Sequence, residues 1–523
     1  MKVRNLASAG LNSDFMPFGL PADHTTELSN VRISNGSLSP FGGSTKVADL
    51  PIDFKPGYLM SVGNSENVFW IIAGLDSVIV YDGTSTTSIS STAGYVNVTS
   101  EDKWTGCNVA DVPILTNPNH FPEYWPSQSA ATKLIPLPWD SNLDWAGANQ
   151  SCRIIRSHKQ FLFALDLVIN GVEVPNGVRW SNPADIGGVP TTWDELDTTD
   201  IAGLTSLKSE GGRVVDGLSL RDSFVVYRER GIAIFDYVGG VFVWQIRQMS
   251  SSAGLISPDS IVEVRGLHYF IGDGDILVND GNKVKSLLHN RIRKHFTSNF
   301  DPGNYKNSFA VRNDIAGEVW FCIPKTGSVY PNIAYIYNWL DDSWSIRDLP
   351  ETPFANYGSR SSVIQTWDSV TNNWGDSVSN WSASNASPLD YTVMSITKPA
   401  GVGQSGSLLQ LDYGLSGLGD SPFNTMIERT GFVIDGLDGV TTVTRVYPYV
   451  KGFGEIYIQF GSQDFPDSAI RWKDAVKFTP GVDRKVDLRT TGELHCYRFF
   501  SNNNSSYWEL SGFDLEYVSA GSR

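Results

Sequence analysis

The sequence predicts an all-β protein: a β-propeller of about six four-stranded blades, with an N-terminal hairpin before it and a β-sandwich after it. Short runs of strand-forming residues alternate with turn residues along the whole chain, which is typical of stacked antiparallel meanders. Glycine (49) and proline (26) interrupt the helical patterns that a bundle or coiled coil needs. Aromatic residues make up 12% and charged residues only 18%, so the chain has enough apolar surface to bury and is not disordered.

The clearest meander lies between Gly211 and Ser250. Four strands follow one another within it, and each is separated from the next by a tight turn such as Arg230-Gly231 or Gly239-Gly240. The expected strands are Arg213–Leu220, Ser223–Arg228, Ile232–Tyr237 and Val241–Arg247. Four strands in about 40 residues match the length and shape of one propeller blade.

The same pattern recurs on both sides of this meander. Three further complete meanders are expected within 58–90, 261–288 and 307–348, and two with longer loops within 103–116 and 153–180. A single meander cannot bury both of its faces, so several must stack around a common axis. We therefore expect the propeller to occupy residues 45–415, with the N-terminal hairpin or arm in residues 1–44.

The last hundred residues depart from the four-strand repeat, and their alternating strands predict a separate β-sandwich over 421–523. Seven alternating strands are expected there, from Thr425–Ile434 to Trp508–Tyr517. One helix is expected at His289–Ser298, because Ile292 and Phe296 share a face four residues apart.

Two groups of residues are candidates for intermolecular contacts. The expected helix carries Arg291, Arg293 and Lys294, which are either solvated charges on a connector or a contact with another subunit or with DNA. Trp367, Trp374 and Trp381 recur every seven residues in a polar segment. Exposed Trp is a good interface anchor, but the pattern favours packing of these rings on their own domain.

No motif indicates catalysis, a metal or a cofactor. The four cysteines are far apart and lack zinc-site spacing, so we expect unpaired, mostly buried thiols. Gly401–Gly406 matches the dinucleotide pattern GxGxxG, but proline precedes it and a strand follows it, so we interpret it as a glycine turn. We expect neither a membrane span nor a secretory signal. The net charge of −16 argues against tight, nonspecific DNA binding.

Three stretches resemble the tail nozzle proteins of short-tailed bacteriophages, also called tail tubular protein B or packaged-DNA stabilisation proteins. The first is Glu27–Gly36, which contains Asn30, Val31, Arg32 and Gly36 and is followed by Gly42-Gly43. The second runs through Ser181–Pro183, Trp193, Tyr227–Ile232, His268–Gly272 and Asp280-Gly281. The third comprises Arg498-Phe499, Tyr507–Gly512 and Asp514-Leu515.

The resemblance implies a structural, non-enzymatic virion protein of the tail, made in the bacterial cytoplasm. The resemblance implies that its partners are further copies of itself in a homohexameric ring, an adaptor or head-to-tail connector protein, and tail fibre, spike or needle proteins. Genomic DNA would pass through without sequence-specific binding, and the tip could contact the host envelope. An interface role is implied for Asn30, Val31, Arg32 and Gly36 in the hairpin. Two alternatives stay open: a glycan-binding or glycan-cleaving propeller resembling a depolymerase, and a protein-binding propeller scaffold.

Overall fold

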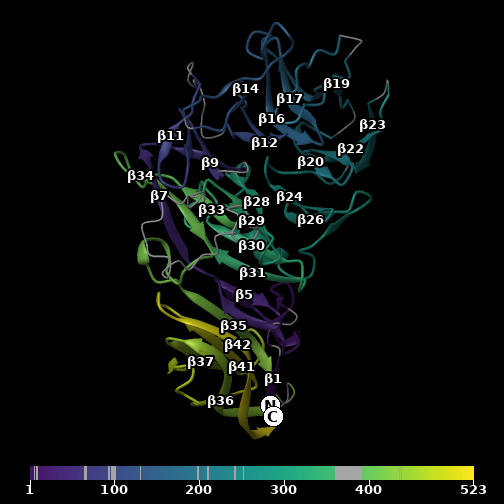
Figure 1. Ribbon diagram of the computed structural model, residues 1–523. Helices are drawn as coiled ribbons and strands as arrows, with labels where there is room; N and C mark the ends of the chain where they lie inside the picture. The colour runs from purple at the N-terminus through teal and green to yellow at the C-terminus, as the bar shows by residue number, and fades with distance from the viewer. Residues whose placement is uncertain are drawn as a thin grey trace.

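The computed structural model describes the chain except for residues 5, 7–9, 64–67, 92–94, 96–101, 130, 197–199, 209–210, 241–242, 251, 360–390, 435, 437–438 and 523. Its upper part in Figure 1 is a β-propeller, and its lower part, drawn in yellow and green, is a β-sandwich. Both chain ends lie in the sandwich, where β1 (Lys2–Arg4) pairs with β42 (Tyr507–Ser522).

The described residues form seven blades of four antiparallel strands, each hydrogen-bonded in meander order. Blade one consists of β8 (Pro56–Gly63), β9 (Val68–Gly74), β10 (Val78–Tyr81) and β11 (Thr86–Ser88). Blade two consists of β12 (Thr105–Val109), β13 (Val112–Asn117), β14 (His120–Tyr124) and β15 (Ile135–Pro136). Blade three consists of β16 (Gln150–His158), β17 (Phe161–Ile169), β18 (Val172–Trp180) and β19 (Gly203–Ser206). Blade four consists of β20 (Val214–Leu220), β21 (Ser223–Arg228), β22 (Gly231–Tyr237) and β23 (Trp244–Ser250). Blade five consists of β24 (Ile261–Val264), β25 (Leu267–Gly272), β26 (Asp275–Asn279) and β27 (Val284–Ser286). Blade six is β28 (Phe309–Asn313), β29 (Glu318–Ile323), β30 (Ile333–Asn338) and β31 (Ser343–Asp348).

Blade seven closes the ring with strands from both ends of the propeller. It contains β32 (Phe354–Ser359), β33 (Tyr391–Thr397) and β34 (Ser405–Leu411), and its outer strand is β7 (Ser44–Ile52) from the N-terminal side. The first strand of every blade packs against the first strand of the next, and β32 packs against β8. The early segment 44–52 therefore fastens the last blade to the start of the chain, as Figure 1 shows for β7 and β34.

The sequence-based fold class is confirmed, and the blade count rises from about six to seven. Blade seven was missed because its outer strand is distant in sequence and because residues 360–390 separate β32 from β33. The helix α1 spans Arg293–Asn299 rather than His289–Ser298. Asn290 has a left-handed backbone (φ 61°), so a regular helix cannot run through it. Ile292 and Phe296 are nevertheless both fully buried.

Burial on both faces explains why the middle strands of the blades are so apolar. All six residues of β29 and all six of β30 are buried, because each blade is sandwiched between two neighbours. Phe321 and Tyr335 of blade six, for example, belong to a cluster that also includes Tyr269 and Ile271 of blade five. Such strands are nearly continuous hydrophobic runs, and hydrophobic burial supplies the main stabilisation.

The sandwich packs two sheets around an aromatic core. One sheet has the order β38 (Arg471–Trp472), β37 (Ile456–Gln463), β41 (Leu494–Ser501), β35 (Thr425–Val433), β4 (Glu27–Ser29), with β39 (Val476–Phe478) also on β37. The other contains β42, β36 (Gly439–Phe453) and β40 (Val486–Gly492). Rings of Tyr497, Phe499 and Phe513 meet between them, with Tyr497 and Phe513 centroids 4.9 Å apart. All seven strands expected from the sequence are present.

A hairpin near the N-terminus joins the two bodies. Its strands are β5 (Val31–Ser34) and β6 (Ser37–Pro40), with Asn35 and Gly36 both at positive φ in the turn between them, as two-residue hairpins require. Strand β5 pairs with β31 of blade six through Val31 and Ile346, and β6 pairs with β42 of the sandwich through Leu38 and Leu510. One ten-stranded sheet therefore runs from the propeller into the sandwich.

Buried histidines make the fold sensitive to mild acid. His268 is fully buried; its Nε2 donates to the Ser219 carbonyl (2.8 Å), so its Nδ1 accepts from the Tyr227 hydroxyl (2.9 Å). Burial lowers the pKa of His268 to about 4, and it does the same for His158 and His495. These rings are therefore neutral in the folded protein, whereas unfolded histidine takes up a proton below about pH 6.5.

We expect the free energy of unfolding to be full above about pH 6.5 and to fall as the pH drops towards about 4. Urea unfolding at a series of pH values measures this loss. His268→Gln should give a shallower decline over the same range, whereas the same change at exposed His289 should leave the slope unchanged. Equal slopes for the wild type and His268→Gln would show that His268 does not contribute.

Candidate functional site

The propeller axis is filled by side chains, and one arginine organises half of it. Arg156 of β16 donates from Nε and Nη2 to the two carboxylate oxygens of Asp216 on β20, both at 2.8 Å. Nη2 also reaches Asp259 Oδ1 (2.7 Å), and Nη1 reaches the Gly106 carbonyl on β12 (2.9 Å). A single guanidinium thus links blades two, three and four with the connection that enters blade five.

The charges of this cluster stabilise one another. Burial opposes the charge on Arg156, but Asp216 and Asp259 outweigh it and hold the arginine pKa well above its ordinary value. The Asp259 amide donates to Asp216 (2.8 Å), and Ala310 of blade six donates to the Asp259 carbonyl (2.8 Å). Lys103 donates to the Ser308 carbonyl (3.0 Å), and burial lowers its pKa to about 8. We call Lys103, Arg156, Asp216 and Asp259 the axial ionic cluster.

Aromatic rings fill the other half of the axis. Tyr58 of blade one lies 4.8 Å from Phe354 of blade seven, and Phe354 lies 5.0 Å from Phe309 of blade six. All three rings are buried. The axis therefore holds a packed core of buried side chains.

The arrangement leaves Asp216 no freedom for acid–base chemistry on a substrate. Both oxygens of Asp216 are already held, by Arg156 and by the amides of Gly217 (2.7 Å) and Asp259. A glycosidase needs two carboxylates that face a sugar, one of them able to donate a proton. Asp216 is fully buried and cannot serve in that way.

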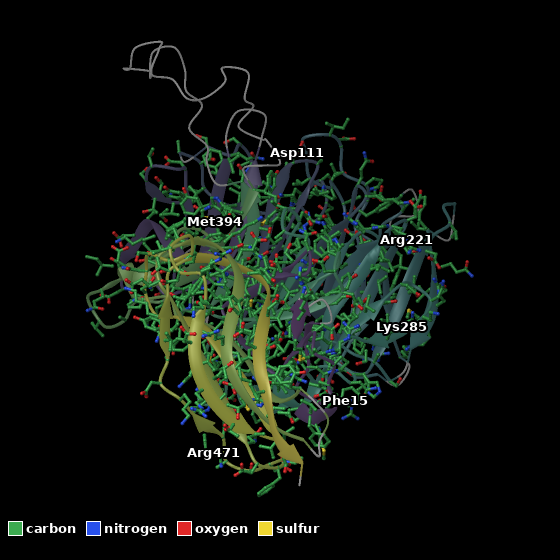
Figure 2. All side chains as sticks on the ribbon, turned by 90° about the horizontal axis from the view of Figure 1, so that it is seen from below. Phe15, Asp111, Arg221, Lys285, Met394 and Arg471 are labelled. Carbon is green, nitrogen blue, oxygen red and sulfur yellow. The ribbon has the colours of Figure 1, made fainter. Side chains whose placement is uncertain are left out.

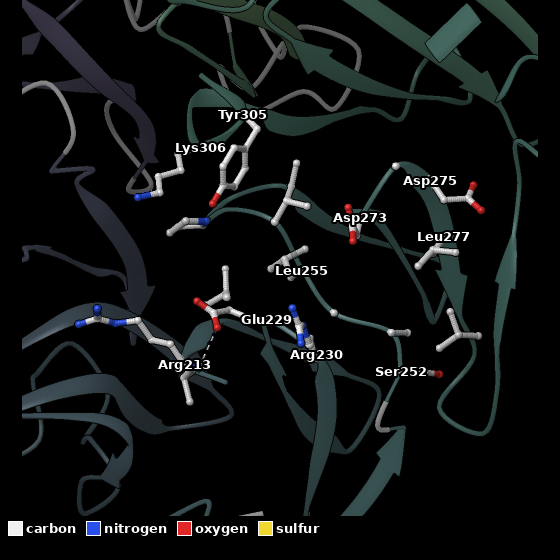
Figure 3. Close-up of a pocket in the computed structure, with 18 of the residues that line it drawn as sticks. Arg213, Glu229, Arg230, Ser252, Leu255, Asp273, Asp275, Leu277, Tyr305 and Lys306 are labelled. Carbon is white, nitrogen blue, oxygen red and sulfur yellow. Dashed lines mark hydrogen bonds between the residues drawn. The ribbon is translucent and has the colours of Figure 1, made fainter. Parts of the chain in front are cut away.

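A large pocket opens beside the axis. Loops that lead into the inner strands form much of its lining, and residues 282–284 join it from the turn at the other end of blade five. The pocket volume is about 1480 Å³, and its lining comes from blades two to five and from the connection between blades five and six. Figure 3 shows the side chains of Arg230, Asp273 and Lys306 around the same open space. We call it the loop-face pocket.

Part of the wall of the loop-face pocket is an internally neutralised set of ion pairs. Asp166 of β17 is buried between Arg153 (3.0 Å) and Arg213 (2.5 Å). Burial raises the pKa of Asp166, and the two arginines counteract that rise. Arg213 also reaches Glu173 (3.2 Å), and its amide donates to Glu229 (3.4 Å), as the dashed line in Figure 3 marks.

The wall also carries cations outside these ion pairs, although Lys283 lies near the Asp280 carboxylate. The side chains of four exposed residues form no ion pair with any residue that the structure describes: Arg230, Lys283, Arg293 and Lys306. Apolar side chains lie between them, including Leu255, Leu277 and Val284. The pocket is thus locally basic although the whole chain is acidic.

The hairpin residues that the sequence singled out lie inside the molecule. Asn30 (φ 56°) donates to the Asn424 carbonyl (2.7 Å) and accepts from the Asp348 amide (2.7 Å). Val31 is fully buried. Arg32 forms two bonds to Glu318 (2.5 and 3.1 Å), pairs with Asp412 and lies over the Phe41 ring (4.6 Å). Gly36 forms the hairpin turn, and an intermolecular role for these residues stays a prediction.

The cations around the helix α1 divide into two kinds. Arg291 is tied to the Asp342 carboxylate (2.6 and 2.9 Å), and the Lys294 Nζ donates to the Asp14 carbonyl (2.8 Å). The side chain of Arg293 instead lines the loop-face pocket. Trp367, Trp374 and Trp381 lie outside the described residues, so their interface role also stays a prediction.

Sequence reasoning did not find the axial ionic cluster or the loop-face pocket. The available signal was a charged residue inside an apolar strand, as for Arg156 in Gln150–His158 and Asp216 in Val214–Leu220. Such residues in a buried strand need a partner from another blade.

The cysteines and potential metal ligands offer no second site in the described part of the chain. Cys107, Cys152, Cys322 and Cys496 are free thiols, and all but the half-buried Cys107 are buried. Burial raises the pKa of Cys107 and Cys152 to about 12, which keeps these thiols protonated. The described residues contain no group of three histidine, cysteine or acidic side chains placed to hold a metal, and none of their helices has the length and apolar character of a membrane span.

Together the ring of sheets and the loop-face pocket define a seven-bladed β-propeller protein with an attached β-sandwich. The sequence matches no protein-family model and no curated protein sequence. Among similar solved structures, YCF48 bound to D1 peptide is 12% identical with a TM-score of 0.35, and the match covers 70% of this chain and 95% of that one. PorZ of the type-IX secretion system of Porphyromonas gingivalis is 10% identical with a TM-score of 0.34, and the match covers 84% of this chain and 46% of that one. The AfRom2 CNH domain is 8% identical with a TM-score of 0.36, and the match covers 71% of this chain and 99% of that one. Similarity at this level carries no inference about function.

Proposed function

We propose that this protein is a non-catalytic scaffold that binds other proteins, and that it works as a ring-forming structural subunit in the tail of a short-tailed bacteriophage. The observation that carries the proposal is the ten-stranded sheet that continues from blade six through β5 and β6 into the sandwich. Hydrogen-bonded strands and a shared hydrophobic cluster connect the two bodies. A stiff two-body subunit suits a load-bearing assembly better than an enzyme that must open and close.

The placement of the nozzle-like stretches supports the finer part of the proposal. The first stretch forms β4 and β5, and the third lies in β41 and β42. Through β35 and β6 these strands belong to the two sheets of the sandwich, so segments from opposite ends of the chain build one junction. The first and third stretches thus coincide with the element that holds propeller and sandwich together, whereas the second lies in blades three to five.

The filled axis adds a constraint on any DNA conduit. Because the axial ionic cluster and the rings around Phe354 fill the propeller centre, DNA would have to pass between subunits rather than through one of them. A ring of several copies provides such a passage. DNA is strongly negative, and six copies of a −16 chain would repel it and let it slide.

Mass measurement tests the proposal directly. We expect the purified chain, alone or after an adaptor ring is added, to form particles close to six times 57.5 kDa. A heterologous ring of this kind needs two different subunit faces that match. A stable monomer that cleaves bacterial surface polysaccharide would overturn the proposal in favour of the depolymerase alternative.

A further inference from the structure

We propose that the loop-face pocket binds an extended acidic peptide segment of another protein. This inference rests on the proposed scaffold function, because it names the kind of partner that the scaffold holds. It concerns the pocket lined by Arg230, Lys283, Arg293 and Lys306, whereas the proposed ring concerns contacts between copies of the chain.

The size of the pocket favours a segment of chain over a small metabolite. Its volume of about 1480 Å³ exceeds the roughly 300–1,000 Å³ that is usual for small-molecule sites. The lining spans blades two to five and the connection that leads into blade six, so a ligand that fills the pocket must be long. Loops on a rigid β scaffold, such as the turns at Arg230 and Gly274, are well suited to hold a peptide without large rearrangement.

The charge distribution selects an acidic ligand. Arg153 and Arg213 are already neutralised by Asp166, but the four exposed cations have no ion-pair partner among the described residues. Asp275, by contrast, is engaged by the Ile276 amide (2.8 Å) and the Ser286 hydroxyl (2.9 Å). The uncommitted groups are therefore mainly positive, and arginine can bind carboxylates in a bidentate manner.

The apolar part of the lining favours a peptide over a nucleic acid. Leu255, Leu277 and Val284 provide places for apolar side chains between the cations. Proteins that bind single-stranded nucleic acid stack successive bases on a series of aromatic rings. The lining that the structure describes for this pocket offers two aromatic rings, those of Phe300 and Tyr305, which is a short stacking surface for a strand of bases. The carboxylates of Glu229 and Asp273 in the same wall would also repel a continuous phosphate backbone. A peptide that alternates acidic and apolar residues matches this mixture.

A peptide array followed by solution binding tests the proposal. The full-length protein is applied to short peptides that alternate leucine with glutamate, glutamine or lysine. We expect binding to the glutamate series, little to the glutamine series and none to the lysine series. The glutamate peptide is then labelled with fluorescein and titrated by anisotropy at low and high salt, where binding should weaken as salt screens the charges.

Blade five offers a matched pair of variants. Lys283 lines the pocket, and Lys285 is an exposed lysine two residues away that does not. We expect Lys283→Glu, and likewise Arg230→Glu, to weaken the glutamate peptide about tenfold, which corresponds to about 1.4 kcal/mol. Lys285→Glu should stay within about twofold of the wild type, because charges on the open surface are largely screened. All the altered side chains are exposed, and circular dichroism checks that each variant folds.

Each remaining outcome decides the matter. Absence of binding to the glutamate series, equal binding of the lysine series, or equal weakening by Lys283→Glu and Lys285→Glu would overturn the inference. Equal or tighter binding of a single-stranded DNA oligonucleotide at the same residues would overturn it in favour of nucleic acid. If the protein assembles into oligomeric rings but binds no acidic peptide, the pocket proposal fails and the proposed structural function stands. If acidic peptides bind but the protein stays monomeric, the proposed ring-forming function fails and the pocket proposal stands.

Discussion

Replacing Arg156 by methionine is expected to lower the free energy of unfolding by about 3–5 kcal/mol, the usual cost of removing one partner from a buried ion pair. The variant leaves Asp216 fully buried without its cation and deprives Asp259 of its closest positive charge. It also removes the bond to Gly106 that ties blade two to the cluster. Urea unfolding of the full chain, followed by tryptophan fluorescence, measures the change.

The control is an arginine whose ion pair is exposed. Arg247 pairs with Asp236 at 2.9 Å, but about half of its side chain is open to solvent. Exposed pairs contribute little to stability, so Arg247→Met should unfold at nearly the wild-type urea concentration. If Arg156→Met were as mild as this control, the axial ionic cluster would not be an essential part of the propeller core.

Replacing Asn30 by alanine is expected to cost about 2–4 kcal/mol, because buried backbone groups lose their partners. The variant leaves the Asp348 amide and the Asn424 carbonyl unpaired at the junction. It also places alanine at a φ of 56°, in the left-handed region that asparagine tolerates better. Because the hairpin joins blade six to the sandwich, the two bodies should also become more susceptible to cleavage between them.

Asn30→Gly separates the two causes. Glycine loses the same hydrogen bonds but adopts a positive φ without strain. We expect Asn30→Gly to be destabilised, but less than Asn30→Ala, when both are measured by thermal unfolding and limited proteolysis. If neither variant differs from the wild type, the amide of Asn30 does not hold the junction.

Local patterns predicted those parts of the fold in which strands are adjacent in sequence. Ser223–Arg228 was placed correctly to the residue, because a buried apolar run lies there between turn residues. Blade seven depends instead on the pairing of Leu411 with Ser44, and no local pattern records a partner that distant. The same reason hid the junction strand β4, which pairs with β35.

The candidate site was hard to predict for a similar reason. Arg156 and Asp216 are 60 residues apart, and each strand alone resembles an ordinary strand with one polar position. Only the closure of the ring brings them together. The cations Arg291, Arg293 and Lys294 were noticed as a group, but the backbone turn at Asn290 and the acids Asp14 and Asp342 give each a different environment. Of the three, Arg293 alone lines the loop-face pocket.

Electron cryo-microscopy of the purified, assembled protein tests the central proposal most directly. The account predicts a closed ring of about six subunits. Each subunit should keep its propeller and sandwich in the fixed arrangement of Figure 1, and the central opening should lie between subunits rather than along a propeller axis. Isolated monomers with the sandwich in variable orientations, or DNA density along the axis now filled by Arg156 and Phe354, would contradict it.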